Sequence, residues 1–309
     1  MPAFKILIML GNQTLKGVVL VALGASSYGM LATFVKLAYQ ENFTTAEVTT
    51  AQFVYGIIGI LIINFFQRTK NKNTAIKASP KNISQLMLAG TSLGMTSVFY
   101  YLAVNYIPVS IGIVLLMQTV WMGVLLEWFL DKKAPSAQKM ISVIVVLIGT
   151  ALAINLFKIN FNDPEINWTK GIIWGLLAAT SFTTTMFTAN KVALEISSAQ
   201  RSLYMLLGGA IIVALFALVT QVTPFNFEIF AKWGIILALF GTIIPPMLLN
   251  AGFPYTGIGL GSIVASLELP VSVLMAYFIL NEEVNSLQWF GIILILLAIV
   301  IMNVKSKKH

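Results

Sequence analysis

The sequence predicts an all-α integral membrane protein, with ten transmembrane helices arranged as two inverted five-helix repeats. Three observations lead to this class. Hydrophobic residues form 58% of the 309-residue chain and charged residues only 10%, which is far from the composition of a soluble domain. Ten apolar stretches are long enough to cross a bilayer. The chain also repeats one pattern twice, and each copy holds an odd number of spans.

The expected spans are joined by short loops that leave no room for a soluble domain. They lie near Gly17–Tyr39, Ala46–Phe66, Ile83–Ala103, Pro108–Leu130, Ala137–Phe157, Gly171–Val192, Leu203–Thr220, Trp233–Ala251, Gly257–Leu280 and Leu287–Val304. The chain is therefore expected to divide into a cytoplasmic N-terminal tail (1–16), a first repeat (17–157), an outer linker (158–170), a second repeat (171–304) and a cytoplasmic C-terminal tail (305–309).

The loop charges predict the orientation. The segment 67–82 carries five basic residues and no acidic one, and Lys132, Lys133 and the lysines of the C-terminal tail fall on the same side. The opposite loops are poor in lysine and arginine, and one of them holds Glu282 and Glu283. Because basic loops stay in the cytoplasm, both termini are expected inside a plasma or inner membrane. Orientation therefore explains the net charge of +8, and we expect no nucleic-acid partner.

Two pairs of segments carry the repeat. Lys16–Phe34 reads KGVVLVALGASSYGMLATF, and Lys170–Thr188 reads KGIIWGLLAATSFTTTMFT. Later, IGIVLLMQTVWMGVLLEWFLDKKAPSAQ in the first half matches GSIVASLELPVSVLMAYFILNEEVNSLQ in the second. Two consecutive five-span units must face opposite ways across the membrane. This is the plan of many secondary transporters, whose site lies near the midplane where the repeats meet.

Glu268 is the main candidate site residue, because it is the one charged group inside the run Gly257–Leu280. A carboxylate at mid-bilayer costs roughly 2.5–3.5 kcal/mol or more, so it requires a polar cavity, a partner or a bound proton. Gln118 occupies the equivalent position in the first half. We expect this pair to bind substrate or to couple transport to protons. The alternative is a structural hydrogen bond between packed helices.

Other polar and aromatic residues are weaker candidates for the same site. Pro245–Pro246 remove two amide donors, which predicts a hinge or a static kink in the eighth span. Asn250 follows about one turn later. Further candidate lining residues are Tyr101, Trp121, Ser27 and Ser181. Aromatic residues also form interface belts, and small hydroxyl residues also serve close helix packing, so these alternatives stay open.

These features resemble the drug/metabolite transporter superfamily and, within it, the EamA-type transporters. The family commonly has a Leu-Glu-Pro-Val-like stretch in the fourth and ninth spans. Here the second copy reads Leu267, Glu268, Leu269, Pro270, Val271, followed by Asn281 and Glu282. The first copy reads Met117, Gln118, Thr119, Val120, followed by Asp131 and Lys132. This chain departs from the pattern where Leu269 separates glutamate from proline and where Gln118 replaces the carboxylate.

The expected function is secondary active transport, with export of small metabolites such as amino acids by alternating access around a midplane cavity. A drug or nucleotide-sugar carrier of the same fold and a non-transporting membrane sensor or assembly factor are the alternatives. The chain has no cysteine, no phosphate-binding loop and a single histidine, His309. We therefore expect no enzyme, cofactor or metal site. The expected partners are a small-molecule substrate, lipid and protons, with the protein a monomer or a homodimer.

Overall fold

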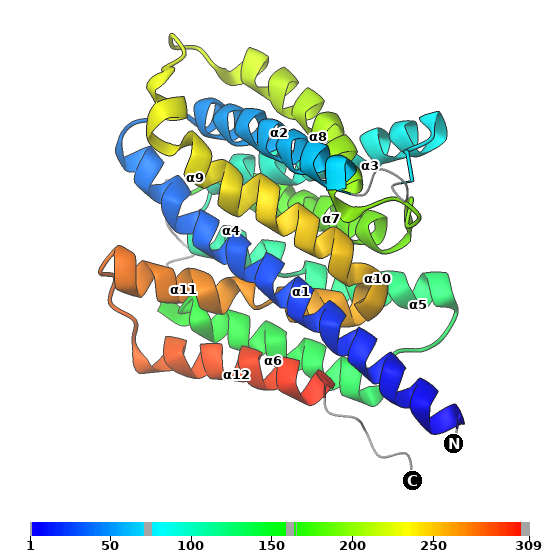
Figure 1. Ribbon diagram of the computed structural model, residues 1–309. Helices are drawn as coiled ribbons and strands as arrows, with labels where there is room; N and C mark the ends of the chain where they lie inside the picture. Colours follow the sequence, from blue (N-terminus) through cyan, green and yellow to red (C-terminus); the bar gives the residue numbers. More distant parts are fainter. Residues whose placement is uncertain (1, 71–75, 159–163, 165, 304–309) are drawn as a thin grey trace.

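The computed structural model describes residues 2–70, 76–158, 164 and 166–303 (Figure 1). This part of the chain contains helices and no strands, which confirms the all-α class. The α-helices are α1 (Pro2–Gln40), α2 (Thr45–Lys70), α3 (Pro80–Val104), α4 (Val109–Leu116), α5 (Thr119–Asp131), α6 (Ala137–Ala153), α7 (Trp168–Lys191), α8 (Ser198–Thr220), α9 (Ile235–Ala238), α10 (Ile244–Ala265), α11 (Glu268–Ile279) and α12 (Ser286–Asn303). Three short turns complete the set: the 3-10 turn η1 (Leu156–Lys158) and the π-helical turns η2 (Phe230–Gly234) and η3 (Leu239–Ile243).

The described residues include seven helical segments that are long and apolar enough to cross a membrane. One of them, Phe230–Ile279, is 50 residues long and contains the eighth and ninth expected spans. Two shorter apolar helices, Ala137–Ala153 and Ser286–Met302, coincide with the fifth and tenth. The chain is therefore a multi-pass membrane protein, and the count of ten crossings stays a prediction.

Local sequence explains where several helices begin. The hydroxyl oxygens of Ser79, Ser136 and Ser197 each accept a hydrogen bond from the backbone N–H three residues later, as capping residues do. At the N-terminus, α1 already begins at Pro2, so residues 2–16 continue the first span as a helix where a separate tail was expected. The C-terminal tail 305–309 and most of the linker 158–170 lie outside the described residues.

The two halves of the chain pack against each other along several pairs of helices. Helix α1 packs along α10, α3 packs against both α7 and α8, and α6 packs along α12. Each of these contacts joins one half to the other. The contact between α3 and α8 depends on glycine, since a Cβ atom on Gly208 would lie 1.9 Å from the Met87 carbonyl oxygen. Small residues of this kind let two membrane helices approach backbone to backbone.

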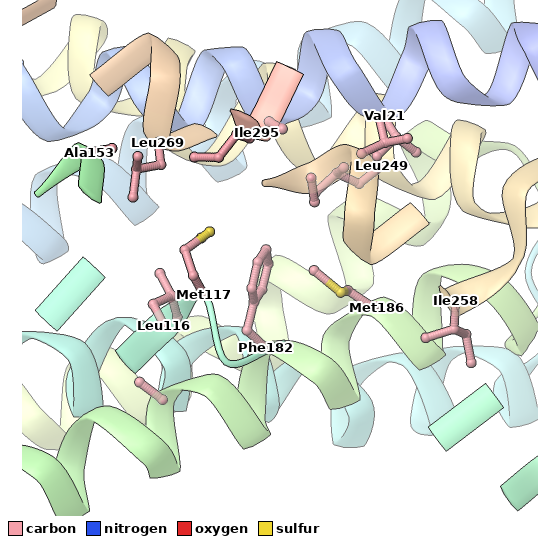
Figure 2. Close-up of a cluster of buried hydrophobic side chains, with 14 of the residues drawn as sticks. Val21, Leu116, Met117, Ala153, Phe182, Met186, Leu249, Ile258, Leu269 and Ile295 are labelled. Carbon is pink, nitrogen blue, oxygen red and sulfur yellow. The ribbon is translucent and has the colours of Figure 1, made fainter. Parts of the chain in front are cut away.

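The largest apolar cluster fills the space between the halves. Figure 2 shows Val21 of α1 and Leu249 of α10 facing Phe182 and Met186 of α7 across this cluster. Leu269, at the start of α11, belongs to the same cluster.

The two ends of the helical bundle carry different connections (Figure 1). The start of α1 and the connection between α5 and α6 lie at one end, which we call the basic end because Lys132 and Lys133 are there. The connections between α1 and α2 and between α11 and α12 lie at the opposite end, which we call the mouth end.

Candidate functional site

A cavity of about 520 Å³ extends from the mouth end to Glu268. Helices of both halves form its wall, chiefly α1, α2, α3 and α11, together with η3 and the connection after α11. Its polar and charged lining residues are Tyr28, Thr33, Lys36, Tyr39, Gln52, Thr96, Ser97, Tyr100, Tyr101, Thr242, Glu268, Ser272, Glu282, Glu283 and Gln288.

One face of α1 supplies much of the wall. Tyr28, Lys36 and Tyr39 line the cavity together with the apolar residues between them, because positions three and four apart share a helix face. Aromatic contacts extend this wall onto α3, where the rings of Tyr39 and Tyr101 are 6.3 Å apart and those of Tyr100 and Tyr101 are 5.9 Å apart. A group of tyrosine rings from α1 and α3 thus forms one part of the cavity wall.

Glu268 enters the cavity from a tight turn between α10 and α11. Pro270 has no N–H to donate to the carbonyl of Ser266, and the N–H of Leu269 donates to that carbonyl instead, at 3.2 Å. This turn makes Glu268 the first residue of α11. Within the described residues, its carboxylate makes no hydrogen bond or ion pair, and Tyr28 of α1 and Tyr100 of α3 line the same cavity.

Gln118 lies at the equivalent turn of the first half, between α4 and α5, but it faces elsewhere. The N–H of Val120 donates to the Met117 carbonyl at 3.0 Å, so the same kind of turn forms here without proline. The side chain of Gln118 donates to the Val114 carbonyl at 3.0 Å and accepts from Trp121 Nε1 at 2.8 Å. Neither Gln118 nor Trp121 is among the residues that line the cavity.

The other sequence candidates are divided between the cavity and the helix packing. Tyr101 lines the cavity. Asn250 is buried and donates to Ser202 Oγ at 2.9 Å, while Ser27 donates to a backbone carbonyl of η3 at 3.0 Å. Asn250, Ser27 and Ser181 are not among the lining residues. The cavity therefore brings together Glu268 and Tyr101 of the predicted set.

Pro245 and Pro246 form the first turn of α10, directly after the π-helical turn η3. They are buried and do not line the cavity, but Gly241 and Thr242 of η3 do. Thr242 Oγ1 also donates to the Gln52 carbonyl at 2.9 Å, which ties η3 to α2. The irregular backbone next to the prolines thus reaches the cavity.

Arg201 closes the basic end. Its side chain is 2% exposed and donates to three carbonyls at the end of α7, at 2.6 to 3.0 Å. A fourth bond, 2.6 Å long, goes to the carbonyl of Asn250 in α10. That carbonyl lies four residues before Pro254, which cannot donate to it. Arg201 therefore joins α7, α8 and α10 through backbone carbonyls at the end of α7 and beside Pro254 of α10.

Ion pairs add to the same closed end. Lys139 pairs with Glu127, and Lys191 lies 3.8 Å from Asp131. Glu127 packs against Gly257, where α10 bends with a φ of 74°. A Cβ atom on Gly257 would lie 2.7 Å from a Glu127 oxygen, and L side chains rarely adopt that backbone conformation. Glycine at this position therefore admits both the bend and the carboxylate.

Sequence reasoning missed Tyr28, Gln52 and Arg201. The spacing of Tyr28, Lys36 and Tyr39 along one helix face was the available signal for the α1 wall. Gln52 offers a weaker signal, as an uncharged amide within an apolar span. Arg201 sits near the start of its span, where a basic residue ordinarily reaches the interface.

Comparison with known proteins identifies the family of this chain. The sequence matches the EamA-like transporter family over residues 15–155 and again over residues 169–304. The chain belongs to the EamA-like transporter family. A solved structure titled only "Crystal structure of protein" has a TM-score of 0.74 at 15% identity, covering 96% of this chain and 99% of that one, and it shows the fold alone. No match was found among curated proteins. The family match confirms the resemblance inferred from the sequence and makes this chain a membrane transporter.

Proposed function

We propose that this EamA-like transporter is a secondary active exporter of small metabolites, working by alternating access around the cavity that holds Glu268. Amino acids are the first class that the sequence suggests. One observation carries the proposal: a carboxylate that has no partner among the described residues lines a cavity whose wall comes from both halves of the chain.

The packing of the halves supports two inverted five-helix repeats with ten crossings. The contact between α1 and α10 has its counterpart in the contact between α7 and α3 when the repeats are exchanged. The turns at Met117–Gln118 and Ser266–Leu267 likewise fall within one residue of the same place in the aligned halves. Phe230–Ile279 bends at Gly257 and is 50 residues long, while one crossing needs about 20 residues. We therefore propose that this segment crosses the membrane twice.

The two ends of the bundle differ as alternating access requires. The cavity reaches the mouth end, while Arg201 and the ion pairs close the basic end. If the basic end faces the cytoplasm of a plasma or inner membrane, both termini are inside and this conformation is open to the outside. Cysteine substitution at Lys77 and at Glu283, followed by labelling with an impermeant thiol reagent in intact cells, tests this orientation. Labelling is expected at residue 283 only.

We further propose that Glu268 exchanges a proton during the cycle. It lies deep in the cavity, and access to water from one side of the membrane at a time would let its carboxyl group exchange a proton. Tyr28 and Tyr100 face it, and Lys36 is farther along the wall, paired with Glu282.

Glu268→Gln tests this role in proteoliposomes, because glutamine keeps the size of the side chain and removes its titration. The variant is expected to insert and fold, to lose proton-driven transport and to have a flat pH profile. Glu228→Gln is a matched control, since that carboxylate is exposed and outside the cavity lining. An unchanged rate and pH profile in Glu268→Gln would make Glu268 a packing residue. Comparing right-side-out and inside-out vesicles measures the direction.

A further inference from the structure

The cavity differs in charge from the rest of the chain. The protein has a net charge of +8, yet one lysine and three glutamates line the cavity, a formal charge of −2 when all are ionised. The lysine is Lys36, which is paired with Glu282 at the mouth. Glu268 lies deep in the cavity, and Glu283 lies near the mouth. A cleft lined by one sign of charge between low-dielectric walls concentrates ions of the opposite sign. The cavity is therefore suited to attract cations.

The unpaired polar atoms of the cavity also select a class of ligand. The Glu268 carboxylate has no hydrogen-bond partner within the described residues. The side-chain oxygen of Gln52 is fully buried and equally lacks a partner in that part of the chain. Both groups are acceptors when Glu268 is ionised, and a buried acceptor without a partner, such as the Gln52 oxygen, carries a desolvation cost. A ligand that brings several N–H donors would remove this cost.

The aromatic wall fits a positive charge as well. Tyr28, Tyr100 and Tyr101 line the same cavity as Glu268, and the rings of Tyr100 and Tyr101 are in contact. Aromatic ring faces attract ammonium groups, most strongly where water is excluded. The remaining wall is mainly apolar, so it suits a ligand with an apolar body.

The same lining is poorly suited to a carboxylate. Lys36 is the one basic residue among the described lining residues, and it already forms an ion pair with Glu282. A zwitterionic amino acid would place its own carboxylate against an acidic cavity without a free cationic partner. An amine that lacks the carboxylate avoids this repulsion.

We infer that the cavity binds an organic amine as its cation, with the ammonium group between Glu268 and the tyrosine rings and its N–H donors directed to the unpaired acceptors. This inference rests on the proposed transport function and narrows its substrate class from small metabolites to amines without a free carboxylate.

Equilibrium binding to the purified full-length protein in lipid nanodiscs tests the inference. The probes are 2-phenylethylamine, phenylalanine and 3-phenylpropionate, which share an apolar body and differ in charge, with ethylamine and tryptamine to vary the size of the amine. The amines are expected to bind, and 2-phenylethylamine at least about tenfold more tightly than phenylalanine, since phenylalanine would bring its own carboxylate into an acidic cavity and like charges placed together cost several kcal/mol. The anion is expected not to bind.

Two substitutions locate the binding. Glu268→Gln is expected to weaken amine binding at least about tenfold, and Gln52→Met several-fold, because one charged and one neutral acceptor are removed. Glu228→Gln is the control and is expected to bind as the unmodified protein does. Thermal unfolding of each variant separates lost binding from lost structure.

Counterflow in proteoliposomes separates this inference from the transport function. Exchange of phenylalanine or 3-phenylpropionate without binding of any amine would leave transport standing and overturn the inference. Glu268-dependent amine binding without exchange of any probe would support the inference and contradict transport. Failure of every amine to bind, or equal binding of phenylalanine and 2-phenylethylamine, overturns the inference.

Discussion

The turns at Met117–Gln118 and Ser266–Leu267 have a similar backbone form but different surroundings. Each interrupts an apolar helical segment at a similar position of its half. In each, a hydrogen bond between residues three apart takes the place of the usual helical bond between residues four apart. Glu268 lines the cavity and has no hydrogen-bond partner among the described residues, whereas Gln118 is held by Val114 and Trp121 on its own segment. Similar turns in the two halves thus place their polar side chains in different surroundings.

The largest effect, a loss of proton-driven transport, is expected when the residues at positions 118 and 268 are exchanged. Glu268→Gln combined with Gln118→Glu keeps the number of carboxylates but moves one to the turn that does not line the cavity. If location decides function, proton-driven transport stays as low as in Glu268→Gln alone. The moved carboxylate would also lie against the Val114 carbonyl and lower stability.

Transport rates of the double variant and of both single variants, measured in the same proteoliposomes, check this prediction. Recovery of transport in the double variant would show that the two turns are functionally interchangeable. In that case the asymmetry in hydrogen bonding would not reflect an asymmetry in mechanism.

The next largest effect is expected on stability, at the basic end of the bundle. Arg201→Gln removes a donor from four carbonyls at the basic end, of which Thr188 keeps a backbone partner, and unsatisfied buried acceptors cost about 1–3 kcal/mol each. The free energy of unfolding is therefore expected to fall by at least about 3 kcal/mol. Arg68→Gln, at an exposed arginine, is the control and should change it by less than about 0.5 kcal/mol. Denaturation in detergent measures both, and equal effects would contradict a closing role for Arg201.

A smaller effect is expected in the first-half turn itself. Trp121→Phe keeps the ring and removes the donor to Gln118, whose bond is 2.8 Å long. Stability is expected to fall by about 1 kcal/mol, and the pH profile of transport should not change because neither residue lines the cavity. A shifted pH profile would place Gln118 in the transport site.

The smallest effect is expected at the mouth. Lys36 and Glu282 form an ion pair whose side chains are half exposed. Exposed pairs contribute about 0–1 kcal/mol to stability, so Lys36→Gln should leave thermal unfolding nearly unchanged, in contrast to Arg201→Gln. A comparable loss in both variants would mean that the mouth is held as firmly as the basic end.

The sequence allowed the helical segments to be predicted closely, but it did not reveal the turns within them. The expected span Pro108–Leu130 was a single helix, but the structure divides it into α4 and α5. Met117 and Val120 are apolar residues and give no sign of the break between the two helices. Such a turn exchanges one backbone hydrogen bond for another, so it needs no polar or breaking residue.

A residue of the candidate site could be predicted where a charged side chain lies in an apolar segment. Glu268 stands out because a carboxylate in an apolar run needs an explanation. Asn250 and Ser27 looked equally polar, yet they satisfy packing contacts that only the arrangement of distant helices reveals. Tyr28 and Gln52 belong to the cavity for the same reason, since their helix faces could not be assigned until α1, α2 and α3 were placed together.

The Arg201 contacts also imply an order of assembly during synthesis. Three of its acceptors lie at the end of α7, just before Arg201 in the chain, whereas the fourth, in Asn250, follows about fifty residues later. When α8 enters the membrane, α7 is already available and α10 does not yet exist. The hairpin of α7 and α8 can therefore shelter the guanidinium group first, and the arrival of α10 completes its shell of carbonyls.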